Sequence, residues 1–508
     1  YSGHTAALYA HDAGTPTVIK GGDIVIDKAV GTENVMTLFT DGGGITAANQ
    51  EGVLNALAGK LTYKNYADGR LTGKLAVGEG LTASSVNQYI TFGGAQGSYD
   101  RTDPRNQGGT PTPPPTNEQT KTEFSTAITS HAGAEYQSAN VAQADGSYKF
   151  TKDTTIRPTT GAAAVTNEGT GAKITVDAAG RALNLEVTGS GRHAGIKNAK
   201  AEPIKITAGT VQIRTQSSGE AYGIWNTKAN SSVRINGDTD IDTKGVTKSH
   251  GLHTYVGSAI TVQGLHVTVN KDSKDGWSIY NGDGTVTVND AGQHDVVLNG
   301  NVFNDSSART DLSLTTAASQ LNGIIHQGDE DDDEEESGFS SSAMHGAARA
   351  GITEGVYLTL TNGAVWNNAD YNQSPGVLHT AGFGGSKLAT LTGGSEEGKA
   401  GVIRQYESNP LTIENYNGGY LNIDYAHDAA TPAKFLGGEM RITHAADNSF
   451  ITLRTDHDGI DSGNQQAVLS ALATKLRYAD YASGKLTGKL QIAEGATAST
   501  VNQYVSFT

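Results

Sequence analysis

The chain has 508 residues, a formal net charge of −16 and no cysteine, and 36% of its residues are hydrophobic. The acidic balance argues against nucleic acid and against an anionic membrane as the main partner. The absence of cysteine excludes a disulfide scaffold, and no apolar run is long enough to span a bilayer. We therefore expect an extracellular protein with a lean core and no membrane insertion by this segment.

The first residues, YSGHTAALYAHD, lack the basic start and the apolar run of a signal peptide. Tyr1 is also an unusual native start. We interpret the chain as a processed or excised portion of a longer secreted protein.

Residues 1–93 and 416–508 are two copies of one unit. The stretch NQEGVLNALAGKL (49–61) returns as NQQAVLSALATKL (464–476), and LTGKLAVGEG (71–80) returns as LTGKLQIAEG (486–495). The apolar spacing in the first pair predicts a short amphipathic helix in each copy, with Thr46 and Asp461 at the N-cap positions. The alternation in the second pair predicts a hairpin or a further strand of a ladder.

Residues 94–120 separate the first unit from the rest and are rich in Pro, Gly and Thr. Four prolines, at positions 111, 113, 114 and 115, favour an extended polyproline conformation with polar flanks. We predict a flexible linker here and prefer it to a proline-motif docking site.

Residues 121–415 contain the clearest periodic signal of the chain. Between residues 174 and 298 three short apolar strands recur with a period of about 28 residues and are separated by Gly, Asn and Asp. The first series is Ile174–Val176, Ile204–Ile206, Val233–Ile235, Ile260–Val262 and Val286–Val288. The second is Leu183–Leu185, Val211–Ile213, Ile241, Val267–Val269 and Val296–Leu298, and the third is Gly195-Ile196, Gly223-Ile224, Gly251-Leu252 and Ser278-Ile279.

Such a repeat is typical of an all-β parallel β-helix, because a single coil cannot bury its own apolar residues and stacked coils bury them together. The acidic run at 329–336 interrupts the rhythm. We predict that it is a solvated insertion loop, because consecutive carboxylates repel one another and cannot be buried. Strands resume at Tyr357 and lead directly into the second copy of the terminal unit.

The runs LTLTNGAVWN (358–367), SKLATLTGG (386–394) and GVIRQYESNPLTIENYNGGYLNIDYAHD (401–428) resemble the passenger domains of autotransporters (type V secretion) of the adhesin and self-association type. The resemblance implies a right-handed β-helix on the bacterial cell surface, anchored to the outer membrane through regions outside this chain. It implies a role in cell adhesion, aggregation or biofilm formation. The implied partner is a protein or glycan on a host or neighbouring cell, or another copy of the chain.

The residues offer few candidates for catalysis, and we expect no enzyme. Asp238, Asp240 and Asp242 alternate along one predicted strand, with Arg234 shortly before them. Paired carboxylates on one face could serve glycoside hydrolysis, although a solvated strand face has the same pattern. A polysaccharide-degrading lyase or depolymerase and a passive structural stalk stay open as alternatives.

One stretch offers a candidate metal site and another a candidate contact site. Asp456, Asp458 and Asp461 place carboxylates around Gly459, as calcium loops do. We prefer a plain Asp/Gly turn, because the first copy keeps only one of these carboxylates, Asp41. We expect no other cofactor. Trp225, Trp277 and Tyr280 lie in the third series. Because the neighbouring Ile points inward, we predict that Trp225 and Tyr280 face outward as a platform for ligands such as sugar rings. His250 and His253 flank Gly251-Leu252 without a metal-ligand spacing, which favours a structural or surface role.

Overall fold

A computed structural model describes residues 1–508 apart from thirteen stretches. The structure leaves out residues 13, 32–33, 47, 79–85, 94–95, 102–105, 107–118, 144–145, 169–171, 329–352, 373–384, 495–497 and 505–508. The predicted acidic loop at 329–336 and the prolines at 111–115 therefore lie outside the described residues.

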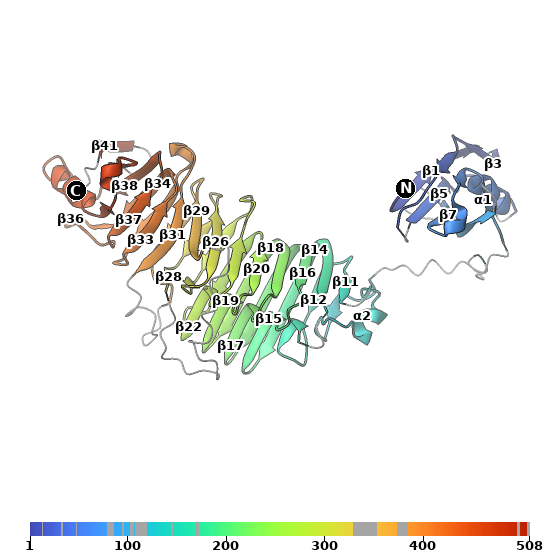
Figure 1. Ribbon diagram of the computed structural model, residues 1–508, viewed down its shortest axis with the longest axis horizontal. Coiled ribbons are helices and arrows are strands. Elements are labelled where there is room, and N and C mark those ends of the chain that lie inside the picture. The colour runs from blue at the N-terminus through green and yellow to red at the C-terminus, as the bar shows by residue number, and fades with distance from the viewer. Residues whose placement is uncertain are drawn as a thin grey trace. The chain divides into compact units, whose positions relative to one another are not determined.

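The described chain is mostly β, and its large sheets are built from parallel strands. It divides into two compact units, Tyr1–Glu118 and Gln119–Thr508 (Figure 1). The strand Gln96–Tyr99 pairs with Val86–Gly93 inside the first unit, so the predicted linker 94–120 is wrong at its beginning. An alternating small and polar stretch gave no signal of that strand.

The first unit contains a five-stranded sheet in the order β1-β5-β7-β8-β9. β1, β5 and β7 are parallel, whereas β8 and β9 run antiparallel to their neighbours. The helix α1 buries Val53, Leu54 and Leu57 and packs against β3, β7 and β9. The elements are β1 (His4–Leu8), β2 (Ala10–Asp12), β3 (Thr15–Lys20), β4 (Ile24–Ile26), β5 (Asn34–Asp41), α1 (Gln50–Ala58), β6 (Leu61–Tyr63), β7 (Leu71–Gly78), β8 (Val86–Gly93) and β9 (Gln96–Tyr99).

The second unit is dominated by a 23-stranded sheet (Figure 1), in which most strands pair with the strands one period earlier and one period later. Only its last pairing, β40 with β41, is antiparallel. Its strands are β10 (Glu123–Phe124), β11 (Ser147–Lys149), β12 (Thr154–Ile156), β14 (Ile174–Gly189), β16 (Ile204–Ser217), β18 (Ser232–Gly245), β20 (Ala259–Val262), β21 (Leu265–Val269), β23 (Thr285–Val288), β24 (Val296–Asn299), β26 (Arg309–Leu314), β27 (Gln320–Asn322), β29 (Gly355–Leu360), β30 (Val365–Asn367), β31 (Ser386–Thr392), β32 (Gly401–Gln405), β33 (Leu411–Tyr416), β34 (Gly419–Tyr425), β37 (Met440–Ala445), β38 (Ser449–Thr455), β39 (Leu476–Tyr478), β40 (Leu486–Glu494) and β41 (Ala498–Tyr504).

A seven-stranded parallel sheet faces this large sheet across the core. Its strands are β13 (Ala163–Asn167), β15 (Arg192–Asn198), β17 (Glu220–Asn226), β19 (Lys248–Thr254), β22 (Asp275–Asn281), β25 (Asn301–Asn304) and β28 (Ile325–Gln327). The unit also contains α2 (Ala134–Ser138), α3 (Gln465–Ala473) and the antiparallel pair β35 (His427–Asp428) and β36 (Thr431–Phe435).

The three predicted strand series are confirmed as strands, and their pairing follows the predicted period. Ile174 pairs with Ile204, then Val233, Ile260 and Val286. The third series aligns Ile196, Ile224, Leu252 and Ile279. The second series holds with one correction. Ile213 pairs with Ile241, and Ile241 pairs with Val267, so the aligned segment begins at Leu265 and not at Val267. All of these aliphatic side chains enter one continuous core.

An asparagine ladder closes the seven-stranded sheet at the carboxyl end of its strands. The aligned residues are Asn167, Asn198, Asn226, Thr254, Asn281 and Asn304, and each is fully buried. Their amides bond to the turns that follow: Asn226 Nδ2 donates to Ala259 O at 2.8 Å, and Asn304 Nδ2 donates to Ala308 O at 2.9 Å. The ladder thus supplies partners for turn carbonyls that the core would otherwise leave without hydrogen bonds.

The two copies of the terminal unit have the same local structure. His11 Nδ1 lies 2.7 Å from Thr40 Oγ1, and the equivalent His427 Nδ1 lies 2.8 Å from Thr455 Oγ1. The predicted helices are present as α1 and α3. The predicted N-caps are wrong, because the helices start at Gln50 and Gln465 and the cap residues are Asn49 and Asn464. The residues Thr46 and Asp461 instead form the turn before each helix.

The alternating tail of the unit combines both predicted forms. β7 pairs in parallel with β5, as a further strand of the ladder, and in antiparallel with β8, as one arm of a hairpin. In the second copy, β40 makes the same two pairings with β38 and β41.

Candidate functional site

The candidate site is the outward face of the seven-stranded sheet, opposite the aliphatic core. Two positions of each third-series strand align from strand to strand. One is the residue directly before the Gly or Ser, and the other is the residue directly after the inward aliphatic residue. The first position holds Tyr222, His250 and Trp277, and the second holds Trp225, His253 and Tyr280. We call these six residues, together with Phe303 and His326, the aromatic–histidine ladder.

Successive rings of the ladder stack on one another. The ring of Tyr280 lies 4.7 Å from that of His253 and 4.8 Å from that of Phe303, with interplanar angles of 8° and 18°. The ring of Phe303 in turn stacks on that of His326 at 5.5 Å. Parallel strands in register bring identical positions about 4.8 Å apart, which is the spacing at which flat rings stack.

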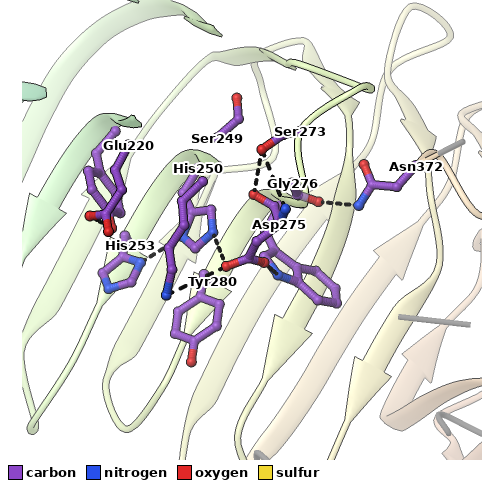
Figure 2. A network of polar contacts seen from close by, with 12 residues as sticks. Glu220, Ser249, His250, His253, Ser273, Asp275, Gly276, Tyr280 and Asn372 are labelled. Atoms are coloured by element: carbon purple, nitrogen blue, oxygen red, sulfur yellow. Dashed lines mark hydrogen bonds and ion pairs between the residues drawn. The ribbon is translucent and has the colours of Figure 1, made fainter. Parts of the chain in front are cut away.

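A polar network connects the rings at the centre of the ladder (Figure 2). His250 Nδ1 and His253 Nδ1 are 2.8 Å apart, so one imidazole donates and the other accepts. Asp275 Oδ2 lies 3.1 Å from His250 Nε2 and 3.9 Å from Lys248 Nζ. Asp275 Oδ1 accepts a hydrogen bond from Trp277 Nε1 at 2.5 Å. The carboxylate therefore connects one imidazole, one ammonium and one indole.

The two imidazoles hold a limited number of protons. A hydrogen bond between two Nδ1 atoms contains a single proton, so only one ring of the pair can become an imidazolium without breaking it. Burial lowers the pKa of His253 well below its usual value, and the neighbouring His250, Lys248 and Arg192 lower it further. Of the two imidazoles, it is His250 that contacts Asp275.

Trp225 lies at the margin of the ladder, where it is partly buried. The ring of Tyr222 stacks on it at 5.2 Å and 15°. Two cations also lie over the indole, with Lys197 Nζ at 4.8 Å and Arg192 Cζ at 5.2 Å from the ring centroid. Glu220 contacts the Arg192 guanidinium and accepts a hydrogen bond from the Tyr222 hydroxyl at 2.8 Å. The margin is thus a half-exposed indole within a set of alternating charges.

The structure shows where the residues of the predicted contact site lie and corrects the expected exposure of one of them. Trp225 and Tyr280 are aligned, and they pack in clusters separate from the core that holds Ile224 and Ile279. The prediction that Tyr280 is an exposed platform is wrong, because only 4% of it is exposed; Trp277 is 2% exposed. An outward position does not ensure exposure here, because each ring is covered by the rings stacked on it.

Two of the three carboxylates of the candidate calcium loop accept hydrogen bonds within turns. Asp456 Oδ1 accepts a hydrogen bond from Asp458 N at 3.0 Å, and Asp461 Oδ1 accepts one from Gly463 N at 2.8 Å. The main-chain carbonyl of Asp458 lies 2.7 Å from His427 Nε2. The residues that the structure describes contain no group of three or more His, Asp or Glu side chains placed to hold a metal ion. Asp456 and Asp461 thus accept main-chain hydrogen bonds, as the aspartates of an Asp/Gly turn do.

The alternating aspartates lie on one outward face of β18, as predicted, but each has a cationic or histidine neighbour. Arg214 contacts Asp240 at 3.6 Å and Asp242 at 3.4 Å. Asp238 Oδ1 lies 3.0 Å from His294 Nδ1. The Arg214 pairs join β16 to β18, and the His294 contact reaches the turn before β24.

Sequence reasoning missed the contacts that make the ladder a site. The sequence assigns His250 and His253 only a structural or surface role, and it singles out neither Glu220 nor Asp275. The period of the repeat could have revealed this site. When Ile224, Leu252 and Ile279 are aligned, the aromatic and histidine residues on either side of them also align from strand to strand.

Comparison with known proteins adds no relative to these observations. No family model matches the chain, and neither a curated protein nor a solved structure matches it. Within the described residues, no helix has the length and apolarity needed to cross a membrane.

Proposed function

We propose that the second unit is a right-handed parallel β-helix that serves as an adhesive passenger of autotransporter type on the bacterial surface. Its support is the regular parallel pairing of β14, β16 and β18, each with the strand one period later. A closed α/β barrel would require a helix after each strand. Between α2 and α3 the described residues contain strands and only one 3₁₀ turn, Glu397–Lys399.

The observation that carries an adhesive function is the repetition of outward side chains along parallel strands. The same register that aligns the core places Arg157 against Glu186, Arg192 against Glu220 and Arg214 against Asp242. A surface of this kind offers many similar polar contacts in a row. Weak contacts that repeat along one molecule give strong attachment by multivalency.

The most specific contact point on this surface is the margin around Trp225. A half-exposed indole beside Arg192, Lys197 and Glu220 combines an apolar patch with charges of both signs. Aromatic and arginine side chains contribute most of the energy in protein interfaces. The partner is accordingly a protein or glycan surface, or another copy of the chain, that covers the indole.

The test is aggregation of beads or cells that display the full chain, with Trp225→Ala as the variant. The matched control is Tyr406→Ala, which removes an aromatic side chain that is 48% exposed elsewhere in the unit. We expect the wild type and the control to aggregate and the Trp225 variant to aggregate at least about tenfold less, which corresponds to about 1.4 kcal/mol. Equal aggregation by both variants would show that the margin is not the contact.

The same material separates the adhesin from its two alternatives. A passive stalk gives no aggregation in any of the three proteins. A polysaccharide-degrading enzyme releases new reducing ends or unsaturated products from acidic or neutral polysaccharides. Sustained turnover of that kind would replace the adhesive proposal.

A further inference from the structure

The first unit has a sheet edge that is covered in the second unit. β34 and β1 occupy the same place in the two copies, yet β34 pairs with β32 on one side and β38 on the other. β1 pairs with β5 and is the edge strand of its sheet. Similarly, β37 pairs with both β33 and β39, whereas the equivalent β4 pairs with β6 in a two-stranded sheet.

The two copies match closely enough for this comparison to be made strand by strand. Ile24 pairs with Leu61 in the first copy, and the equivalent Met440 pairs with Leu476 in the second. The ammonium groups of Lys60 and Lys475 also donate to equivalent carbonyls, those of Gly21 and Gly437, at 2.9 and 2.6 Å. In the second copy, one further turn of the repeat, formed by β32 and β33, pairs with β34 and β37; we call such a turn of the repeat a coil. The described strands of the first unit include no such coil beside β1 and β4.

The inward side chains along this edge are smaller and more exposed than their equivalents in the second copy. In the second copy, Leu421 and Ile423 of β34 are 1% and 0% exposed beneath β32. The equivalent positions in β1 are Thr5, which is exposed, and Ala7, which is half-buried. The main-chain groups of β1 that point away from β5 lie along the edge of the sheet, and such groups are a template for strand addition.

Two outward side chains of the same strands are large and apolar in the first unit. Leu8 is 57% exposed and Val25 is 53% exposed. Their equivalents in the second copy are Asp424, which contacts Arg454 at 2.6 Å, and Arg441. Exposed aliphatic residues on an edge strand promote association, and natural edges usually carry charges instead.

We infer that the edge formed by β1 and β4 binds one further coil of the same repeat, with two parallel strands of the β32–β33 type. The coil would pair with β1 and β4 in the register that β32 and β33 have with β34 and β37. Its inward residues would be aliphatic, as Ile403 and Ile413 are, because they must cover the core beside Ala7 and Ile26. This inference depends on the strand pairing alone and not on the proposed adhesive function.

The experiment grafts the missing coil onto the full chain. Residues 400–418 are placed directly before Gly3 and replace the first two residues, which reproduces the junction that precedes Gly419. Hydrogen exchange is then measured at the amides of Thr5 to Leu8, with the amides of β34 as an internal reference. We expect the graft to slow exchange in β1 at least about tenfold, towards the rate in β34.

The matched control is the same graft with Ile403→Asp and Ile413→Asp in the added copy only. It has the same length and composition elsewhere but cannot bury its inward side chains, so we expect exchange in β1 to stay at the wild-type rate. Equal protection by both grafts, or by neither, would overturn the inference. The mass of the ungrafted chain in solution is measured as well: a dimer with β1 already protected would show that a second copy occupies the edge and would also overturn it.

Discussion

Asn281 makes more hydrogen bonds than other members of the asparagine ladder, and replacing it with alanine tests how the ladder stabilises the second unit. Its Nδ2 donates to Arg309 O at 2.9 Å, Thr310 Oγ1 at 3.0 Å and Asn304 Oδ1 at 3.1 Å. Its Oδ1 accepts hydrogen bonds from Gly284 N and Thr254 Oγ1 at 2.9 and 2.5 Å. The side chain is fully buried, so water cannot replace these partners.

The magnitude follows from the donors that lose their acceptor. In Asn281→Ala the buried Gly284 N–H and the buried Thr254 hydroxyl both lose the Oδ1 acceptor. An unsatisfied buried group costs about 1–3 kcal/mol, so the two together give a loss of about 2–4 kcal/mol after some relaxation. That loss corresponds to a roughly 30- to 700-fold increase in local opening.

Local hydrogen exchange is the suitable assay, because a chain with two units and a repeating core does not unfold in one step. We expect faster exchange in β22 and β25 and little change in the first unit. Asn236→Ala is the control: Asn236 is a partly exposed asparagine of β18 whose change should cost less than about 0.5 kcal/mol. If Asn281→Ala opened the unit no more than this control, the ladder would not stabilise the turns.

Two further predictions concern pH. Hydrogen bonds from Lys121, Thr126 and Ser125 outweigh the effect of burial and lower the pKa of Glu135 to about 2 from 4.5. The stabilisation by the Glu135 carboxylate is therefore complete above pH 4.5 and is lost towards pH 2. We expect Glu135→Gln to lose about 1.5–3 kcal/mol of stability at neutral pH and to remove this acid dependence, both measured by urea unfolding. Since the pKa of His253 is lowered on folding, the unfolded chain takes up protons more readily below its usual pKa, and stability should fall from about pH 7 to pH 5. His253→Phe should reduce that fall, and an unchanged pH profile in either variant would contradict the reasoning.

The fold was predictable wherever the period could be read from aliphatic residues. Ile204, Val233 and Ile260 repeat at nearly constant spacing, and each residue of such a series pairs with the next. The second series was placed two residues too late at Val267, because Leu265 and Val269 are equally suitable apolar neighbours and only the pairing distinguishes them. Periodicity thus locates a strand well but fixes its register only when the flanking residues differ.

The candidate site was less predictable, because exposure depends on side chains one period away. The alternation around Ile279 correctly places Tyr280 on the outward face, yet its burial depends on His253 and Phe303, each in a neighbouring strand. The same limit applied to Asp456, whose carboxylate looked like a ligand and is a hydrogen-bond acceptor in its own turn. Local sequence describes one strand, whereas the chemistry of this face arises between strands.

The antiparallel strands that follow each terminal unit determine how molecules of this kind can join. A parallel ladder can in principle lengthen without limit, because every added strand repeats the geometry of the last one. In the first unit β8 reverses that direction beside β7, and β9 reverses it again. β8 therefore occupies the free edge of β7, so that a further parallel strand cannot pair with β7 on this side. On this side the parallel ladder of the first unit ends at β7, and an added strand would have to pair with β9 instead.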